Sequence, residues 1–214
     1  MATTTADSDV ERLLKYIDEH IPEMFGVPGL WPGNVELALI DAVLSIRARY
    51  GTSSTTGVRG AVKRYEVASG RDSWDDLKTL AEADPTWLQE VLANKQKTGG
   101  VTKPEVIRSA AERLLSVGAR HAADIDRNST DQRGAYCGTK GLGPVTWAYF
   151  TMLLGHDGVK ADTLVTRFVE LAIGRKVGSE ECARLVTEAA NRLDMPATAL
   201  DHSIWRYMSD PRKD

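Results

Sequence analysis

Residues 140–167 read KGLGPVTWAYFTMLLGHDGVKADTLVTR, and they decide the fold prediction. The glycine turn at residues 141–143 is followed by Pro144, whose fixed φ suits the first position of a helix. Apolar residues recur at helical spacing after Pro144, and a second amphipathic run begins just after Asp162. The stretch therefore predicts two helices, with a glycine turn before the first and an aspartate cap on the second.

The glycine turn is suited to holding an anion. Both glycines can adopt positive φ, which lets successive backbone N–H groups point outward. The helix that starts at Pro144 adds its own unpaired amide groups and the positive end of its dipole. A phosphate oxygen can bind at such a position without any lysine, and this contact does not distinguish one DNA base from another.

This arrangement resembles the helix-hairpin-helix DNA glycosylases, the base-excision superfamily of endonuclease III, the adenine mismatch glycosylases and the 3-methyladenine glycosylase II group. In that family a Gly-hydrophobic-Gly hairpin binds the DNA backbone, and an aspartate in a Val-Asp-Thr-like setting is the catalytic carboxylate. The matching positions here are residues 141–143 and Asp162. The likeness extends more weakly from Val35–Arg49 to Leu200–Trp205. The resemblance assigns DNA-backbone contacts to Lys140, Gly141, Leu142, Gly143, Val145 and Thr146.

Two roles suit Asp162. Cleavage of an N-glycosidic bond passes through an oxocarbenium-like sugar, which a nearby carboxylate stabilises while it orients the attacking water. Aspartate is also a favoured helix N-cap, and Asp162-Thr163 ahead of an apolar run suits that role with no catalysis at all. The two roles are compatible, and the resemblance favours catalysis.

Some residues depart from the family pattern. Thr139-Lys140 stands where Leu-Pro usually precedes the first glycine, and Ala161 stands where valine usually precedes the aspartate. Relatives that also cut the DNA backbone carry a Schiff-base lysine two residues after the second glycine, where this chain has Val145. Because valine cannot form an imine, the resemblance implies a monofunctional enzyme.

Cysteine and histidine usage argues against a metal centre. Cys137 and Cys182 are too few for the four-cysteine iron–sulfur cluster of endonuclease III-like relatives. The four histidines show no paired ligand spacing with either cysteine, which argues against zinc. We therefore predict two reduced thiols, no metal and no cofactor.

The charge distribution suits DNA binding despite a net charge of -3 over 214 residues. Residues 1–93 carry 9 basic and 15 acidic side chains, a net of -6. Residues 94–176 carry 13 basic and 8 acidic side chains, a net of +5, and residues 177–214 carry 5 basic and 7 acidic side chains, a net of -2. Positive charge, which supplies backbone affinity, is concentrated around the glycine turn. Such segregation also occurs in proteins that never meet nucleic acid.

Composition and periodicity predict a globular all-α protein. Hydrophobic residues make up 42% of the chain and charged residues 27%, as in ordinary globular domains. No run approaches the roughly 18 apolar residues of a membrane span, so we expect a cytoplasmic, nucleoid-associated bacterial monomer without membrane contact. The predicted helices are Val10–Glu19, Val35–Arg49, Thr56–Ala68, Trp74–Ala81, Pro85–Leu92, Lys103–Leu115, Ala122–Asp126, Pro144–Leu154, Asp162–Ile173, Ser179–Leu193 and Ala197–Met208.

The family architecture implies two helical lobes. Residues 36–155 are expected to form the central lobe, which carries the hairpin. Residues 1–35 and 156–214 are expected to form the second lobe, which carries Asp162. A ligand cleft is expected between the lobes.

Three residues are candidates for a wedge that fills the gap left by an everted base. In relatives this side chain comes from the loop after the first long helix, which here supplies Arg47, Arg49 and Tyr50. The alternative is a solvated helix end, with the arginines facing the helix dipole and the tyrosine packed on a neighbour.

Other residues are weaker candidates for the site. Tyr136 and Tyr149 could contact the everted base, with packing in the core as the favoured alternative for both. Lys103, together with Lys95 and Lys97 around a Thr-Gly-Gly loop, suits a second phosphate contact. The equally favoured alternative is that these lysines are solvated loop charges that bind no phosphate.

The sequence thus predicts a monofunctional DNA glycosylase that everts a damaged, mismatched or modified base from double-stranded DNA and hydrolyses its N-glycosidic bond. One alternative is a non-catalytic helix-hairpin-helix DNA-binding module, in which Asp162 only caps its helix. Another is an all-α interaction protein without a DNA partner, which predicts no salt-dependent DNA binding. Candidates for the base are alkylated purines, uracil or thymine in mismatches, and a modified base of a phage or rival genome.

Overall fold

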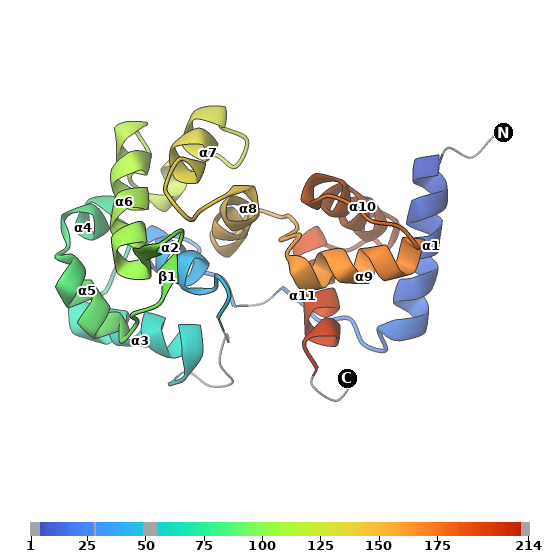
Figure 1. Cartoon of the computed structure of the whole chain (residues 1–214), viewed down its shortest axis with the longest axis horizontal. Helices are drawn as coiled ribbons and strands as arrows, with labels where there is room; N and C mark the ends of the chain where they lie inside the picture. Colours follow the sequence, from blue (N-terminus) through green and yellow to red (C-terminus); the bar gives the residue numbers. More distant parts are fainter. Residues whose placement is uncertain (1–4, 28, 49–54, 211–214) are drawn as a thin grey trace. The chain divides into compact units, whose positions relative to one another are not determined.

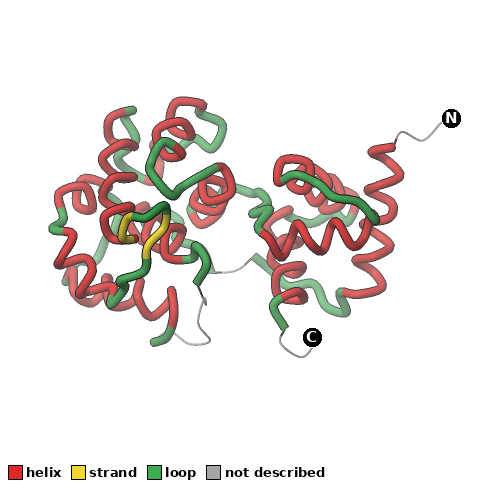
Figure 2. The backbone as a smooth tube through the Cα atoms, viewed as in Figure 1, coloured by secondary structure: helices red, strands yellow, loops and turns green. Residues whose placement is uncertain are grey.

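A computed structural model of the chain describes residues 5–27, 29–48 and 55–210. Helices make up most of these residues, as Figure 1 shows, and two short strands are drawn in yellow in Figure 2. The predicted all-α fold is confirmed. Within the described ranges, no helix combines the length and apolar character needed to cross a bilayer.

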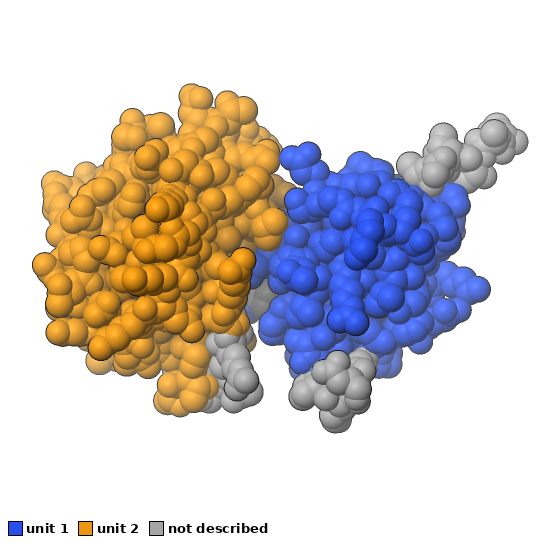
Figure 3. Space-filling model, in the orientation of Figure 1, with its two compact units in different colours: residues 1–29, 157–214 blue, residues 30–156 orange. Residues whose placement is uncertain are grey.

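The chain divides into two compact units, coloured separately in Figure 3. The smaller unit combines residues 1–29 with residues 157–214, and the larger unit is the continuous segment 30–156. Chain segments from both termini therefore build one hydrophobic core, and the middle of the chain builds another.

The first boundary between the two units lies after residue 29, whereas the predicted boundary was placed after residue 35. Residues 30–35 belong to the larger unit because Trp31 is bonded into it. Its backbone N–H donates to the carbonyl of Leu153 at 2.6 Å, and its indole N–H donates to Asp41 Oδ2 at 3.1 Å.

Helix α2 is the central element of the larger unit. All ten of its residues are buried, as expected of a helix that is apolar on nearly every side, and it contacts α3, α4, α6 and α8. The helical elements of this unit are α2 (Val35–Leu44), α3 (Gly57–Ser69), α4 (Leu77–Glu82), α5 (Pro85–Leu92), α6 (Lys103–Ser116), the 3-10 turn η1 (Ala122–Asp124), α7 (Thr130–Cys137) and α8 (Pro144–Leu153).

Helix α2 ends at Leu44 and does not continue to Arg49 as predicted. Two turn residues follow, and Arg47 then adopts a φ of 49°, in the left-handed region that ends a right-handed helix. Residues 49–54, which include the wedge candidates Arg49 and Tyr50, lie outside the described part of the chain.

Two elements of the larger unit were not predicted from the sequence. Helix α7 is short and polar: Ser129 caps it by accepting from the N–H of Gln132, and only Gln132 and Tyr136 are buried. The other is an antiparallel hairpin of two-residue strands, β1 (Lys97–Thr98) and β2 (Val101–Thr102). Its signal was the Gly-Gly pair between the strands, which is typical of a two-residue hairpin turn.

The smaller unit packs four amphipathic helices around one core. Helices α1 and α11 each contact both α9 and α10. At one end of α1, the fully buried carboxylate of Asp9 binds the guanidinium groups of Arg12 and Arg175, which neutralises its charge. The helices are α1 (Thr5–His20), α9 (Thr163–Ile173), α10 (Ser179–Arg192) and α11 (Ala197–Met208).

Candidate functional site

The glycine turn leads from α7 into α8. Gly141 has a φ of 91°, which a residue with a Cβ rarely adopts. The N–H of Leu142 donates to the carbonyl of Thr139 at 3.0 Å and closes the turn. Gly143 is extended, with a φ of -164°, so positive φ occurs at the first glycine alone and not at both as predicted.

The hydroxyl of Thr146 is hydrogen-bonded to one backbone N–H group of this turn. The N–H of Gly143 donates to Thr146 Oγ1 at 2.9 Å, and the hydroxyl donates back to the Gly143 carbonyl at 2.8 Å. Among the described residues, no backbone acceptor is bonded to the N–H groups of Lys140, Gly141, Val145 or Thr146. These four amides, two in the turn and two in the first turn of α8, are therefore the donors left for an anion.

The β1–β2 hairpin packs directly on the glycine turn. The Thr98 hydroxyl donates to the Gly141 carbonyl at 3.0 Å. A Cβ on Gly99 would lie 2.8 Å from the Cα of Gly141, and a Cβ on Gly141 would lie 2.7 Å from the carbonyl carbon of Thr98. The backbone of the β1–β2 hairpin therefore packs directly against the backbone of the glycine turn. The exposed side chain of Lys97 lies on the hairpin, and that of Lys140 lies in the glycine turn.

Lys103 does not contact solvent, which corrects the prediction of a phosphate contact. Its side chain begins in the first turn of α6 and is 1% exposed. Its Nζ donates to the carbonyls of Leu44 and Ile46 at 2.9 and 2.7 Å, and to Gln96 Oε1 at 2.8 Å. Burial lowers the pKa of Lys103 to about 8, so the ammonium is still mostly charged at neutral pH. Lys103 thus caps the carboxyl end of α2, directly before Arg47.

Replacing Lys103 with methionine should lower the free energy of unfolding by about 2–4 kcal/mol, because it leaves buried carbonyls without a donor. Urea unfolding followed by circular dichroism measures the change. The matched control is Lys97→Met on the exposed hairpin, expected to stay within about 0.5 kcal/mol of the wild type. Equal stability of the Lys103 and Lys97 variants would contradict a structural role for the buried ammonium.

Arg47 is the one wedge candidate whose structure is described. Its side chain is exposed, and its left-handed backbone directs the chain away from the axis of α2. The carbonyl just before it belongs to Ile46 and is held by Lys103. The wedge role itself stays a prediction.

Tyr149, on α8, belongs to a buried polar cluster that was not predicted from the sequence. Its hydroxyl donates to Asp41 Oδ1 at 3.3 Å, and the same carboxylate accepts from the Ser45 hydroxyl at 3.1 Å and the Trp31 indole at 3.1 Å. Asp41 is fully buried in α2. The available signal was an acid in the middle of a helix whose other residues, apart from Glu36 in the first turn, are apolar, since a buried charge needs donors from other elements.

Tyr136 is fully buried, which agrees with the favoured alternative of core packing and not with a role in the base pocket. Its ring stacks on Phe150 with centroids 5.5 Å apart and planes at 8°. Its hydroxyl donates to the Thr146 carbonyl at 3.3 Å. Trp147 packs in the same core, with 3% of its surface exposed.

Asp162 is the N-cap of α9 in the smaller unit. Its Oδ1 accepts from the N–H groups of Leu164 and Val165 at 2.9 and 3.1 Å. The side chain is half-buried, and in the described part of the chain no hydrogen bond to its Oδ2 is found. Capping thus uses one carboxylate oxygen and leaves the other for a ligand.

Residues 11–209 match the model of a protein family described as Domain of unknown function (DUF8548). The chain belongs to this family. A search among curated proteins found no match.

Three solved structures share the fold of this DUF8548 protein. A thermostable thymine-DNA glycosylase is 16% identical, with a TM-score of 0.55 over 97% of this chain and 89% of that one. A trapped endonuclease III–DNA covalent intermediate is 15% identical, with a TM-score of 0.54 over 99% and 87%. MBOgg1 in complex with a low affinity DNA ligand is 13% identical, with a TM-score of 0.58 over 97% and 70%. The resemblance stated from residues 140–167 is supported at the level of the fold.

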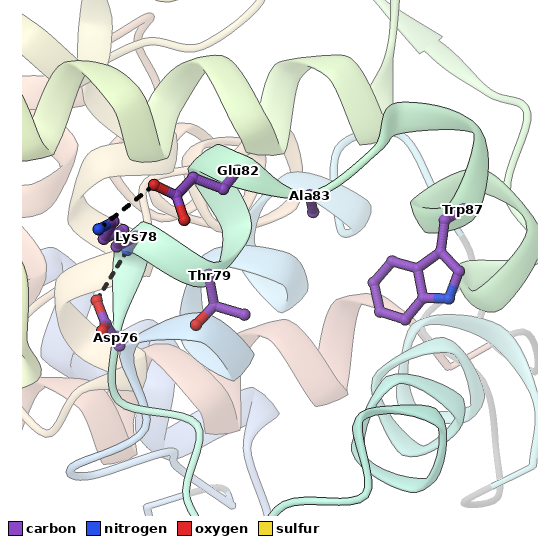
Figure 4. Close-up of a pocket in the computed structure, with 6 residues that line it drawn as sticks. All are labelled: Asp76, Lys78, Thr79, Glu82, Ala83 and Trp87. Atoms are coloured by element: carbon purple, nitrogen blue, oxygen red, sulfur yellow. Dashed lines mark hydrogen bonds and ion pairs between the residues drawn. The ribbon is translucent and has the colours of Figure 1, made fainter.

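A surface hollow of about 430 Å³ lies beside α4 and α5 of the DUF8548 protein (Figure 4), and its lining includes no predicted site residue. Lys78 and Glu82 form an ion pair of 3.5 Å on its wall, and Asp76 caps α4. The lining residues are Asp76, Lys78, Thr79, Glu82, Ala83 and Trp87.

The two cysteines of the DUF8548 protein are free thiols. Burial raises the pKa of Cys182 to about 12, which makes it unreactive at neutral pH. Over residues 5–27, 29–48 and 55–210, no cluster of three or more His, Cys, Asp or Glu side chains is arranged to hold a metal ion.

Proposed function

We propose that this protein is a monofunctional DNA glycosylase that everts a base from duplex DNA and hydrolyses its N-glycosidic bond, with Asp162 as the catalytic carboxylate. The observation that carries the proposal is the glycosylase fold over 97% or more of the chain, with Asp162 heading α9 and one of its oxygens free of the cap. The glycine turn with its unbonded amides supports the same function.

DNA is held through its phosphates in this proposal. The amides of Lys140 and Gly141 and those at the start of α8 donate to phosphate oxygens, and the Lys140 ammonium adds charge. Such contacts fix the position of the duplex and carry no sequence information. Binding is therefore expected to weaken steeply with salt.

The reacting nucleotide leaves the base stack, which costs a few kcal/mol. The exposed side chain of Arg47 enters the gap, and Lys103 holds the backbone from which Arg47 projects. A cationic wedge also gains from the neighbouring phosphates.

Asp162 supplies the chemistry. The C1′–N bond breaks with its electron pair on the departing base, and positive charge develops on the sugar. The free Oδ2 of Asp162 stabilises that charge and accepts a proton from the water that attacks C1′. The base takes up a proton from solvent, and an abasic sugar remains.

The sugar–phosphate backbone stays intact because the chain offers no amine at the expected position. Val145, in the first turn of α8, stands where a Schiff-base lysine would be needed. Strand cleavage therefore requires a separate alkaline step.

The proposal is tested with a panel of duplexes that contain uracil, alkylated purines or mismatches. We expect strand breaks at one class of lesion only after heating in alkali. Breaks without alkali would contradict the monofunctional assignment, and no breaks in any duplex would contradict the enzyme.

A second function, a non-catalytic DNA-binding module, is favoured by one observation: the cap bonds to Leu164 and Val165 give Asp162 a complete structural role. This function predicts salt-dependent DNA binding with no abasic product. The same panel, assayed for binding by fluorescence anisotropy, separates the two.

A further inference from the structure

The segment that leads to Asp162, residues 157–162, is bonded to the start of α11. The carboxylate of Asp157 accepts from the N–H groups of Ala197 and Thr198 at 3.2 and 2.9 Å. The Thr198 hydroxyl accepts from the N–H of Gly158 at 3.0 Å and donates to its carbonyl at 3.2 Å. Helix α11 therefore fixes the first half of this segment.

Asp201 lies one helical turn after Thr198 and continues this pattern. Its Oδ1 accepts from the N–H of Lys160 at 2.9 Å, and its side chain is almost fully buried. The carbonyl of Lys160 accepts in turn from the N–H of Asp162 at 2.6 Å. Two consecutive hydrogen bonds thus connect the buried acid to the backbone of the proposed catalytic residue.

We propose that Asp201 is a positioning residue, whose carboxyl group holds the Lys160 turn and so fixes the direction of the Asp162 side chain. The proposal rests on the proposed function, because it concerns the same carboxylate. It assigns a role to a buried acid that the reaction itself does not use.

Asp201 is expected to be uncharged while it does this. Burial, with a smaller contribution from the negative charge of Asp162, raises the pKa of Asp201 to about 8, and the Lys160 N–H and ammonium only partly oppose the shift. The titratable groups that face it are Asp162 at the head of α9, Cys182 on α10 and Lys160. A neutral acid still accepts the Lys160 N–H and places no second negative charge beside Asp162.

Ionisation of Asp201 should therefore disturb the site. As the pH rises through about 8, a second carboxylate forms beside Asp162, and repulsion between the two displaces the Asp162 side chain even though the Lys160 N–H still donates to Asp201. We expect the wild-type excision rate to fall about tenfold between pH 7.5 and 9.5.

Two variants test the proposal on the best substrate of the lesion panel. Asp201→Asn keeps an oxygen acceptor and cannot ionise, so its rate should stay within about threefold of the wild type at pH 7.5 and should not fall by pH 9.5. Asp201→Leu has similar bulk but no acceptor, so its rate should fall about 30-fold while its DNA affinity is unchanged. An alkaline fall in Asp201→Asn, or a rate for it as low as that of Asp201→Leu, would overturn the proposal.

Thermal unfolding gives a readout that needs no activity. The pKa of Asp201 is about 8 in the folded chain and near 3.8 when unfolded, so between these values the folded state binds the extra proton. Stability of the wild type relative to Asp201→Asn should then fall from pH 4 to pH 8 and stay level above it. A constant difference would contradict a neutral Asp201 and with it the alkaline fall in rate, whereas a wild type inactive on every lesion would overturn the proposed function.

Discussion

Replacing Asp162 with asparagine is expected to lower the single-turnover excision rate about a thousandfold while the protein stays folded. An amide oxygen caps a helix nearly as well as a carboxylate does, so the bonds to Leu164 and Val165 should persist. The neutral amide cannot balance positive charge at C1′ or accept the proton of the attacking water. Single-turnover measurement with enzyme in excess isolates this step from binding and product release.

Asp162→Ala is the matched comparison. It removes the cap as well as the charge, so it should lose a similar factor in rate and also about 1 kcal/mol of stability. The pair separates the two roles of this residue. An asparagine variant with the wild-type rate would restrict Asp162 to capping and favour the non-catalytic module.

The second large effect is expected for Gly141→Ala, which should weaken DNA binding more than tenfold and destabilise the fold by about 2–3 kcal/mol. The left-handed φ of 91° is unfavourable for alanine, and the new Cβ would lie 2.7 Å from the carbonyl carbon of Thr98. Because that neighbour is backbone, the β1–β2 hairpin must move away. Anisotropy titrations at several salt concentrations measure the loss.

Gly143→Ala is the control in the same turn. Gly143 is extended, and a Cβ there would meet nothing within 4 Å. We expect its affinity to stay within about threefold of the wild type and its stability within about 1 kcal/mol. A larger loss for Gly143→Ala than for Gly141→Ala would show that the contact with the β1–β2 hairpin does not hold the turn.

Helices with long apolar periodicity could be predicted from the sequence. The start of α8 at Pro144 and the cap of α9 at Asp162 were both predicted, because local signals specify them. Helix α7 was missed because it buries few residues and carries Gly134 within a polar run, so its stability comes from tertiary packing.

The candidate site was less predictable because its polar contacts join distant parts of the chain. Lys103 looked like a surface cation in the sequence, yet its acceptors include carbonyls of Leu44 and Ile46, 59 and 57 residues away. The same holds for Asp201, whose partner Lys160 is 41 residues away. Sequence spacing identifies groups on one helix face, but it does not indicate which buried groups will meet across elements.

The most direct test of the proposed activity is mass spectrometry of the small molecules released from lesion-containing duplexes. The wild-type protein should release one class of free base in stoichiometric yield and leave an intact strand with an abasic site, and Asp162→Asn should release none over the same time. No free base from any duplex, or equal release by the wild type and Asp162→Asn, would contradict an Asp162-dependent glycosylase.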